Sequence, residues 1–498
     1  MKFYSNFFSR GNKLYVRGYT DKGIQVQNTY DITPVLYTEK PPKSFSGASS
    51  EHTNIYGNVV YPTKFSSPKE AREFLKSYSD SGMRIWGYPR FDYAKIDELF
   101  PGVVNFDLSQ IRIMAIDIET TVDFGFPDIF HPKEEVTLIS ASFKGKVYTF
   151  GARPYVNTDP DVVYVECKDE EHLFKKFIEF YVTINPDVVT GWNINGFDLP
   201  YLYNRITNVV NEEYANKLSP YGWCKKSTTN FNGRDGLVIE ISGIMVIDYL
   251  ELYKKFELSP RENYRLDTIA QIELDEHKVE YDCTFKELYT DHWQEKFVPY
   301  NVQDVRLIDR LDKKLGFIAI AASMAYRSKC NYVDVYRVTR VWDNIIANFL
   351  RESNVHVIAD FRHHGDTYEG AFVKPTIPGL FKIVASFDVK SLYPSLICQY
   401  NISPDTILPP KYFPNINATD VIERNGKYEL AVSLAKEHNA TLCANGSMYR
   451  KDKRGFMPTL VELYMKERES AKKEMKKWQK EAEAAKLQLI KLEEKETA

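Results

Sequence analysis

The sequence predicts a multidomain α+β protein. At 498 residues the chain is too long for one compact core, because domains usually hold about 100–200 residues each. Hydrophobic residues make up 43% and aromatic residues 14%, which is enough for large cores and excludes a mainly disordered chain. Short alternating strands fill the first 110 residues or so, and a strand-rich and then helix-rich stretch begins at Ile111. That order of elements is typical of an α/β or α+β domain.

Composition also narrows the class of protein. The six cysteines lie more than 40 residues apart with no CxxC pair, which disfavours a disulfide scaffold or a zinc ribbon and favours a reduced, intracellular chain. No apolar run reaches the ~18 residues of a membrane helix, and the N-terminus lacks the apolar core of a signal peptide. The formal net charge of −3 neither requires nor forbids a nucleic-acid partner.

Periodic patterns predict the individual elements. The run from Ile111 to Thr120 is β-branched and carries two carboxylates, and Glu170–Thr183 has an apolar stripe at helical spacing. The polar stretch Tyr221–Gly236 lies between hydrophobic segments and is typical of a hairpin or long loop. Further strands are predicted at Val35–Tyr37, Val59–Tyr61, Val136–Phe143, Lys146–Phe150 and Ile383–Phe387, the last one buried.

The tail differs from the rest of the chain. Beyond Pro458 there is no further Pro or Gly, and Lys and Glu dominate, so a helix is expected to start near Pro458 and Thr459. Apolar residues then recur at steps of three and four, the spacing of a coiled-coil seam. The alternative is an ordinary solvated helix. A seam must pack on this protein or on a partner; its residues are Met475, Trp478, Ala482, Ala485, Leu489 and Leu492.

Three segments carry carboxylates in a suggestive order. Asp117 and Glu119 are two residues apart on a strand, so both side chains point to one face, where they repel unless they are protonated or share a cation. Mg²⁺ takes such oxygen ligands. Asp198 follows a turn and stands at the start of a predicted helix, and Tyr300 and Asp304 fall on one helix face. Each piece alone has a structural explanation, as a helix cap or a surface pair.

Together these residues resemble the three exonuclease motifs in the proofreading domain of family B DNA polymerases. The resemblance implies a ribonuclease-H-like fold in which Asp117, Glu119, Asp198 and Asp304 hold two Mg²⁺ or Mn²⁺ ions about 4 Å apart. It implies that Tyr300 orients the attacking water or the scissile phosphate while the 3′-terminal phosphodiester is hydrolysed. The stretch Tyr221–Gly236 matches in position the hairpin with which these domains part primer from template.

A second motif, Asp388-Val-Lys-Ser-Leu-Tyr-Pro-Ser395, resembles motif A of the same family. Asp388 is predicted to end a buried strand, where a carboxylate is costly without a cation. The turn after it offers backbone N–H groups to a triphosphate. The resemblance implies metal contacts from Asp388 and Val389 and nucleotide contacts from Ser391, Leu392 and Tyr393, with Tyr393 under the sugar, where it excludes a 2′-hydroxyl.

Two further pieces resemble the family. Tyr368 and Gly370 belong to a YxGA string that matches a DNA-contacting motif. Arg468 and Lys472 fall four residues apart on the tail helix and match the finger-helix cations that bind the incoming triphosphate. On a helix so rich in Lys and Arg, they could equally be ordinary solvated charges.

The resemblance runs over essentially the whole chain and is to the T-even bacteriophage type of family B polymerase. It implies an N-terminal domain at 1–110 and 317–360, an exonuclease domain at 111–316, a partial palm at 361–445 and a partial finger at 446–498. It covers only about the front half of such a polymerase. The strings K-x-x-x-N-S-x-Y-G and D-T-D-S, which supply the second finger helix and the second palm carboxylate, do not occur.

With Asp388 as the sole palm carboxylate, we expect that this chain alone does not polymerise. We expect an N-terminal subunit of a split replicative polymerase, whose second subunit packs on the Met475–Leu492 helix. The expected partners are primer–template DNA, single-stranded 3′ ends and deoxynucleoside triphosphates, with a sliding clamp reached through the second subunit, in the cytoplasm of an infected bacterial host.

Three alternatives remain. The chain could be a piece cut from a single-chain polymerase. It could be a free-standing 3′–5′ exonuclease, although the complete motif A argues against that. A non-catalytic binding protein is disfavoured, because acidic groups beside phosphates do not help binding.

Overall fold

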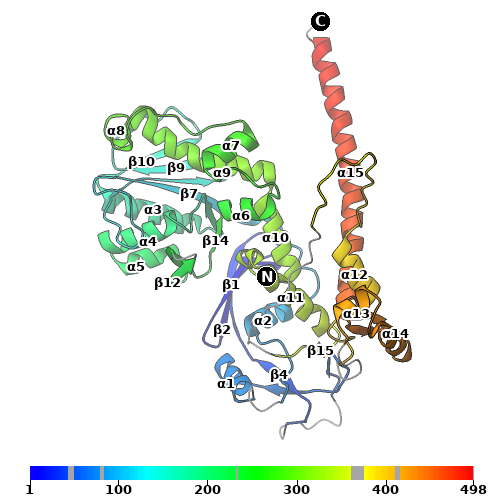
Figure 1. Ribbon diagram of the computed structural model, residues 1–498. Coiled ribbons are helices and arrows are strands. Elements are labelled where there is room, and N and C mark those ends of the chain that lie inside the picture. The colour runs from blue at the N-terminus through cyan, green and yellow to red at the C-terminus, as the bar shows by residue number, and fades with distance from the viewer. Residues whose placement is uncertain (43–49, 79–82, 232–233, 360–374, 410–415, 497–498) are drawn as a thin grey trace. The chain divides into compact units, whose positions relative to one another are not determined.

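The computed structural model describes residues 1–42, 50–78, 83–231, 234–359, 375–409 and 416–496 (Figure 1). Contacts divide the chain into two compact units. Unit 1 comprises Met1–Ala48 and Val60–Asp360, and unit 2 comprises Ser49–Val59 and Phe361–Ala498. Within the described ranges, no helix has the length and apolar character needed to cross a membrane.

Unit 1 begins with a small antiparallel sheet made of β1 (Phe3–Arg10), β2 (Lys13–Tyr19) and β3 (Gln25–Asp31). A second antiparallel pair follows, β4 (Val35–Thr38) with β6 (Tyr61–Lys64). The first of the two predicted short strands is therefore confirmed, whereas the second begins at Tyr61 rather than at Val59. Two helices and a 3₁₀ turn complete this region: α1 (Pro68–Tyr78), α2 (Phe91–Leu99) and η1 (Leu108–Gln110).

The centre of unit 1 is a mixed sheet of six strands in the order β10-β9-β8-β7-β11-β14. The antiparallel meander that the sequence predicts forms its middle, and parallel pairs extend it on both sides. The strands are β7 (Ile113–Thr120), β8 (Val136–Phe143), β9 (Lys146–Gly151), β10 (Val162–Glu166), β11 (Val188–Gly191) and β14 (Met245–Asp248).

Helices cover both faces of this sheet (Figure 1). On one face lie α3 (Glu170–Ile184) and α4 (Asp198–Val209), and the opposite face is covered by α9 (Val298–Leu315). The predicted apolar stripe of α3 is confirmed, since all five of its residues are buried: Leu173, Phe174, Phe177, Ile178 and Tyr181. The sheet is therefore the middle layer of a three-layer unit.

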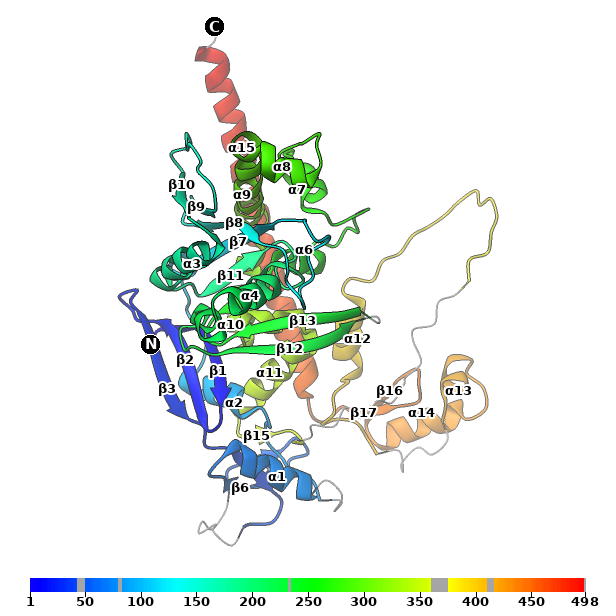
Figure 2. The same ribbon diagram turned by 90° about the vertical axis from the view of Figure 1, so that its left-hand side faces the viewer.

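The predicted polar hairpin is also present. Strands β12 (Cys224–Phe231) and β13 (Arg234–Ile241) pair with each other alone and extend as a two-stranded ribbon (Figure 2). The other elements of unit 1 are α5 (Glu212–Ala215), η2 (Asn216–Leu218), α6 (Tyr249–Phe256), α7 (Leu266–Leu274), α8 (Phe285–Asp291), the π turn η3 (Trp293–Phe297), α10 (Phe317–Ser328), η4 (Tyr332–Tyr336), α11 (Val338–Arg351) and β15 (Val355–His356).

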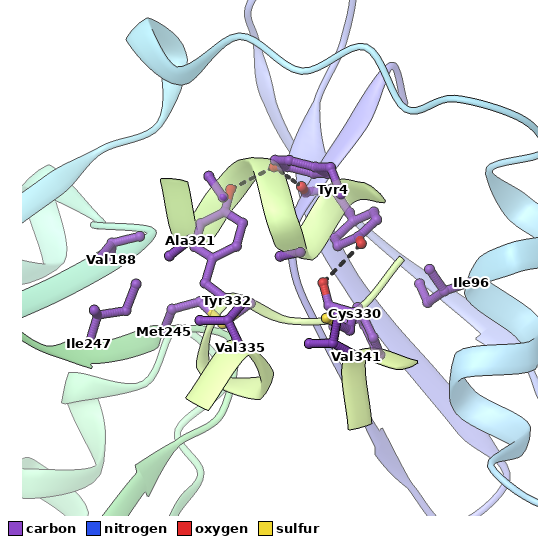
Figure 3. Packing of buried hydrophobic residues seen from close by; sticks show 14 of the residues in the cluster. Tyr4, Ile96, Val188, Met245, Ile247, Ala321, Cys330, Tyr332, Val335 and Val341 are labelled. Atoms are coloured by element: carbon purple, nitrogen blue, oxygen red, sulfur yellow. Dashed lines mark hydrogen bonds between the residues drawn. The ribbon is translucent and has the colours of Figure 1, made fainter. Parts of the chain in front are cut away.

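After α9 the chain returns to the N-terminal sheet, and one hydrophobic core joins the two regions (Figure 3). Tyr4 of β1 donates a hydrogen bond to the backbone oxygen of Cys330, 2.9 Å away. Val188 and Met245, which belong to the central sheet, are part of the same core. The N-terminal sheet and the central sheet are therefore packed together inside unit 1.

A buried ion pair adds to this junction. Arg17 of β2 and Asp187, which precedes β11, lie 3.6 Å apart with no exposed side-chain surface. Arg17 also donates to the backbone oxygens of Pro186 and Gly243, while Asp187 accepts from the backbone N–H of Arg112. The pair thus connects β2 to the ends of three strands of the central sheet.

Unit 2 consists mainly of helices. They are α12 (Leu392–Tyr400), α13 (Ala418–Ile422), α14 (Tyr428–Glu437) and the long α15 (Phe456–Glu496), accompanied by β5 (Thr53–Asn54) and the pair β16 (Ala440–Leu442) and β17 (Met448–Arg450). The predicted tail helix is confirmed but starts two residues earlier, at Phe456.

The first turn of α15 is held by side chains from an earlier loop. The N–H groups of Gly455, Phe456 and Met457 donate to Asn401, Asp405 and Ser403, respectively. These bonds satisfy the free amides that every helix start leaves. Farther along, the described seam residues of α15 are exposed, with Trp478 at 63%, and the side chain of Leu492 lies outside the described residues.

The predicted buried strand Ile383–Phe387 is wrong. The segment belongs to no strand, and Ile383 and Phe387 are 91% and 92% exposed. Asp388 after it is exposed as well. The physical reason is that a strand exists only in a ladder of backbone hydrogen bonds, and none of the described segments pairs with this one. Hydrophobic patterning alone could not show that no described segment pairs with it.

Replacing Arg17 by Met should strongly destabilise unit 1. Asp187 would then be buried without its cation, a loss that typically costs about 3–5 kcal/mol. Thermal unfolding should show a midpoint several degrees below that of the unchanged protein. Lys13→Ala is the control, because Lys13 and Asp31 form an exposed pair worth at most about 1 kcal/mol. Equal shifts for the two variants would contradict the role given to the buried pair.

Candidate active site

Three carboxylates from two elements converge at the central sheet. Asp117 and Glu119 lie on β7, and Asp304 lies on α9, which covers that face. One carboxylate oxygen of each lies within 4.8 Å of the other two. Glu119 and Asp304 are buried, and Asp117 is half-buried. The alternation of the strand places the first two together, and only the packing of α9 adds the third.

Asp198, the fourth predicted carboxylate, lies beside this cluster. It is the first residue of α4 and is buried. Its Oδ1 accepts a hydrogen bond of 3.2 Å from the backbone N–H of Ile118, the residue between Asp117 and Glu119. The structure therefore brings together all four acidic residues of the three exonuclease-like motifs.

Burial and mutual repulsion make these carboxylates weak acids. Burial, reinforced by Asp304 and Asp198, raises the pKa of Asp117 well above its usual value. Burial and the charge of Asp304 raise the pKa of Glu119 to about 8. Burial raises the pKa of Asp198 to about 7 and that of Asp304 to about 6. A group of acids arranged in this way resists ionisation unless a cation compensates.

Lys278 is a site residue that the sequence analysis missed. Its Nζ lies 2.5 Å from Asp304 Oδ2 and 2.9 Å from the Tyr300 hydroxyl. Burial lowers the pKa of Lys278, but Asp304, Tyr300 and Asp117 together raise it more, so the ammonium stays charged. Lys278 lies in an irregular segment between α7 and α8, and no periodicity marks such a residue. Its side chain supplies one positive charge to the cluster.

One carboxylate oxygen of the cluster has no hydrogen-bond partner, whereas another is held by a neighbouring side chain. Asn301 on α9 donates from Nδ2 to Asp117 Oδ2 at 2.7 Å, which fixes that carboxylate. Asp304 Oδ1, by contrast, is buried and has no hydrogen-bond partner. A buried carboxylate oxygen without a partner is costly, and a divalent cation would satisfy it. Oxygen ligands in this number and spacing suit Mg²⁺ or Mn²⁺, so the residues present fit the implied metal.

The cluster forms one wall of a pocket of about 650 Å³. The loop Phe126–Phe130, the turn Trp192–Phe197 and Asp235 near the start of β13 also line it. Phe126 is 93% exposed. An exposed ring beside a polar pocket provides a surface on which a nucleobase can stack. The sequence analysis missed Phe126, because an isolated aromatic residue in a loop has no pattern.

The residues predicted to bind metal and triphosphate, in motif A and on the tail helix, are mostly exposed to solvent. Asp388, Val389 and Tyr393 are exposed, as are Arg468 and Lys472 on α15. Arg468 Nη1 lies 3.5 Å from Ser391 Oγ, and Lys390 pairs with Glu469. The start of α12 at Leu392, just after Ser391, is therefore near Arg468, one of the two predicted finger-helix cations.

Among the described residues, no cluster of three metal-ligating side chains includes Asp388. Tyr368 and Gly370 lie outside the described residues.

Comparison with known proteins identifies the family. The model of the family B DNA polymerase exonuclease domain matches residues 11–269, and that of DNA polymerase family B matches residues 331–493. The chain belongs to family B of the DNA polymerases. Among curated relatives, the DNA-directed DNA polymerase of Escherichia phage RB69 is 30% identical over 95% of this chain and 54% of its own length.

Two other relatives show the same partial coverage. The DNA-directed DNA polymerase of Enterobacteria phage T4 is 29% identical over 98% of this chain and 56% of its own length. DNA polymerase 1 of Pyrococcus abyssi is 24% identical over 91% of this chain and 54% of its own length. The chain thus spans about half the length of the curated relatives that it matches.

The raised carboxylate pKa values predict a pH-dependent stability. Because these pKa values are raised by folding, the folded state binds protons more tightly than the unfolded state does. The resulting stabilisation of the fold is fully present below about pH 4 and is lost as pH rises through about 6–8. When a chelator is present to remove divalent metal ions, the midpoint of thermal unfolding should therefore fall by several degrees between pH 5 and pH 8. Added Mg²⁺ should reverse that fall. The double variant Asp117→Asn with Glu119→Gln should show a flatter profile; an equally steep one would contradict this assignment.

Proposed function

We propose that this chain is the N-terminal, exonuclease-bearing subunit of a replicative DNA-directed DNA polymerase, with 3′–5′ hydrolysis at the Asp117–Glu119–Asp304 cluster. The convergence of these carboxylates, with Asp198 beside them, carries the proposal. Such a site could not remain ionised without cations, and its pocket is large enough for a terminal nucleotide. Membership of family B is consistent with this chemistry.

In this proposal Asp117, Glu119, Asp198 and Asp304 hold two divalent ions, Mg²⁺ or Mn²⁺. When bound, a pair of such ions activates water and stabilises the leaving oxygen. The chain's own residues do the rest. Asn301 holds the carboxylate of Asp117 in place.

Two neighbours of the carboxylates act on the substrate. The Tyr300 hydroxyl, held by Lys278 at 2.9 Å, orients the attacking water or the scissile phosphate. Lys278 offsets part of the negative charge that the carboxylates and the phosphate bring together.

The exposed Phe126 is proposed to stack on a base of the single-stranded 3′ end. Asp235, which pairs with Asn230 near the turn end of the β12–β13 hairpin, lines the same pocket; this supports the proposed role of the hairpin in parting primer from template.

The proposed fold is ribonuclease-H-like. The antiparallel meander β7–β8–β9, continued by the parallel strands β11 and β14, supports it. The proposed domains are an N-terminal domain at 1–110 and 317–360, the exonuclease at 111–316, a partial palm at 361–445 and a partial finger at 446–498. The core shared by β1 and the helices after α9 supports the two-part N-terminal domain.

For nucleotide addition, Asp388 and Val389 are proposed as metal contacts. Ser391, Leu392, Tyr393, Arg468 and Lys472 are proposed as contacts to the deoxynucleoside triphosphate. Tyr368 and Gly370 are proposed to contact the primer–template DNA. The approach of Arg468 to Ser391 supports the nucleotide site, since a guanidinium beside a helix start favours phosphate.

A second chain is proposed to supply the remaining palm, fingers and thumb. Two described surfaces of unit 2 support it. Large apolar side chains between residues 377 and 393 are exposed in succession, including Leu380, Ile383 and Phe387. The α15 seam exposes Met475, Trp478 and Leu489. Exposed apolar surface in one place usually marks an interface. The proposed setting is an infected bacterial host, with a sliding clamp bound through the second chain.

The exonuclease is tested with a labelled single-stranded oligonucleotide. Asp117→Ala with Glu119→Ala should lower the hydrolysis rate by more than about 10³-fold, since the lost charge stabilisation is several kcal/mol and 1.36 kcal/mol is tenfold. Binding of the oligonucleotide, measured by fluorescence anisotropy, should remain. Asp334→Asn, a buried carboxylate outside the pocket, is the matched control. An unchanged rate in the double variant would refute the site.

The polymerase half is tested with a labelled primer–template, Mg²⁺ and all four deoxynucleoside triphosphates. This chain alone should shorten the primer without extending it, because Asp388 is its sole proposed palm carboxylate. Asp388→Ala should leave the shortening unchanged. Extension by the single chain would refute the requirement for a second one.

A further inference from the structure

Asp248 holds an unusual place beside the proposed exonuclease site. It is the last residue of β14, is buried, and pairs in register with Gly191, the last residue of β11. The turn that follows Gly191 leads directly to Asp198. Asp248 itself contributes nothing to the lining of the pocket. Its hydrogen bonds reach the site through that turn.

Both carboxylate oxygens of Asp248 are used. Oδ1 accepts from the backbone N–H of Leu250, at 3.0 Å, which caps α6. The same oxygen accepts from the N–H of Asn193, and Oδ2 accepts from the N–H of Asn195, each at 3.1 Å. A helix cap needs one acceptor oxygen, so Oδ2 serves the turn alone. A threonine or serine would suffice for the cap, whereas two amides of one turn need a bidentate acceptor.

The turn has an uncommon backbone geometry and lies tightly against β7. Asn193 has a φ of 63°, in the left-handed region that non-glycine residues seldom adopt. Gly191 lies so close to β7 that a Cβ would come within 2.6 Å of the Ile116 backbone oxygen. The turn therefore lies directly against the strand that carries Asp117 and Glu119, and it has little freedom to relax.

From Asn193 the geometry is transmitted to Asp198 by backbone hydrogen bonds. Gly196 and Phe197 donate to the Asn193 oxygen at 2.9 and 3.1 Å, and Leu199 donates to the Ile194 oxygen at 3.0 Å. Fixing the amides at 193 and 195 thus fixes the residue at which α4 begins. Without Asp248, the amides of Asn193 and Asn195 lose their acceptor and the start of α4 is released.

We propose that Asp248 is a positioning residue: its two oxygens clamp the turn that sets Asp198 against β7, and so complete the metal-binding set. The inference rests on the proposed exonuclease function. It assigns no contact between Asp248 and substrate or metal. Outer groups that orient ligands in this way typically change metal affinity by about 10–100-fold when replaced.

The test compares Asp248→Thr with the unchanged protein. The threonine hydroxyl still caps α6 but cannot bridge two amides. Mn²⁺ binding is followed directly by the electron paramagnetic resonance signal of free Mn²⁺, together with the thermal midpoint and oligonucleotide binding without metal. We expect the Mn²⁺ affinity of the variant to fall by about 10-fold, with oligonucleotide binding within twofold. Asp334→Asn is the control: this carboxylate also accepts from a backbone N–H and a tyrosine, away from the pocket, and should leave Mn²⁺ affinity unchanged.

The outcomes separate the two proposals. If the unchanged protein binds no more Mn²⁺ than the Asp117→Ala, Glu119→Ala variant, the exonuclease site itself is refuted. If it does bind, but Asp248→Thr binds equally well, the positioning role is refuted. A loss of affinity in Asp334→Asn as large as that in Asp248→Thr also refutes it, because destabilisation alone would then explain both. Should Asp248→Thr fail to fold, Asp248→Asn, which keeps the shape and one acceptor oxygen, is measured in the same way and must show a weaker affinity.

Discussion

The constraint on which the rest of unit 1 depends is the crowding of acidic groups at the centre of the sheet. Carboxylate oxygens of Asp117, Glu119 and Asp304 lie within 4.8 Å of one another in a poorly solvated place, and Asp198 lies beside them. Their repulsion opposes folding, so each must be held by structure that is stable without it. The sheet and α9 provide that support, and Lys278 supplies one compensating charge. This support allows the folded chain to keep the proposed metal ligands together despite their cost in stability.

Buried carboxylates elsewhere in unit 1 show what distinguishes a structural acid from a reactive one. Asp187 accepts from Ser5, Gln25 and the Arg112 backbone and faces Arg17. Asp248 likewise has three backbone donors. Their hydrogen bonding is satisfied by the protein. Asp304 Oδ1, in contrast, has no partner. Burial alone is common to all of them; the unsatisfied oxygen in a lined pocket is what identifies a binding site.

Unit 2 presents the opposite situation, in which apolar rather than polar groups lack partners. The start of α15 is firmly bonded to Asn401, Ser403 and Asp405. Beyond it, the apolar side chains of the helix and those of residues 377–393 face solvent. Exposed apolar area is unfavourable by roughly 25 cal/mol per Å², so these surfaces gain most from being covered. A hydrophobic pattern in a sequence predicts that a segment is buried, but it does not show which other residues cover that segment.

The sequence by itself determined the elements whose signal is local: the meander β7–β8–β9, the stripe of α3, the hairpin and the long tail helix all follow from periodicity within one segment. It also determined which acidic residues to consider, since their order matches a family. Only the tertiary structure decided that α9 brings Asp304 to β7, that Lys278 and Asn301 join the cluster, and that Ile383–Phe387 forms no strand. These facts depend on contacts between residues far apart in the chain, and spacing along a sequence carries no information about the partner on the other side of a contact.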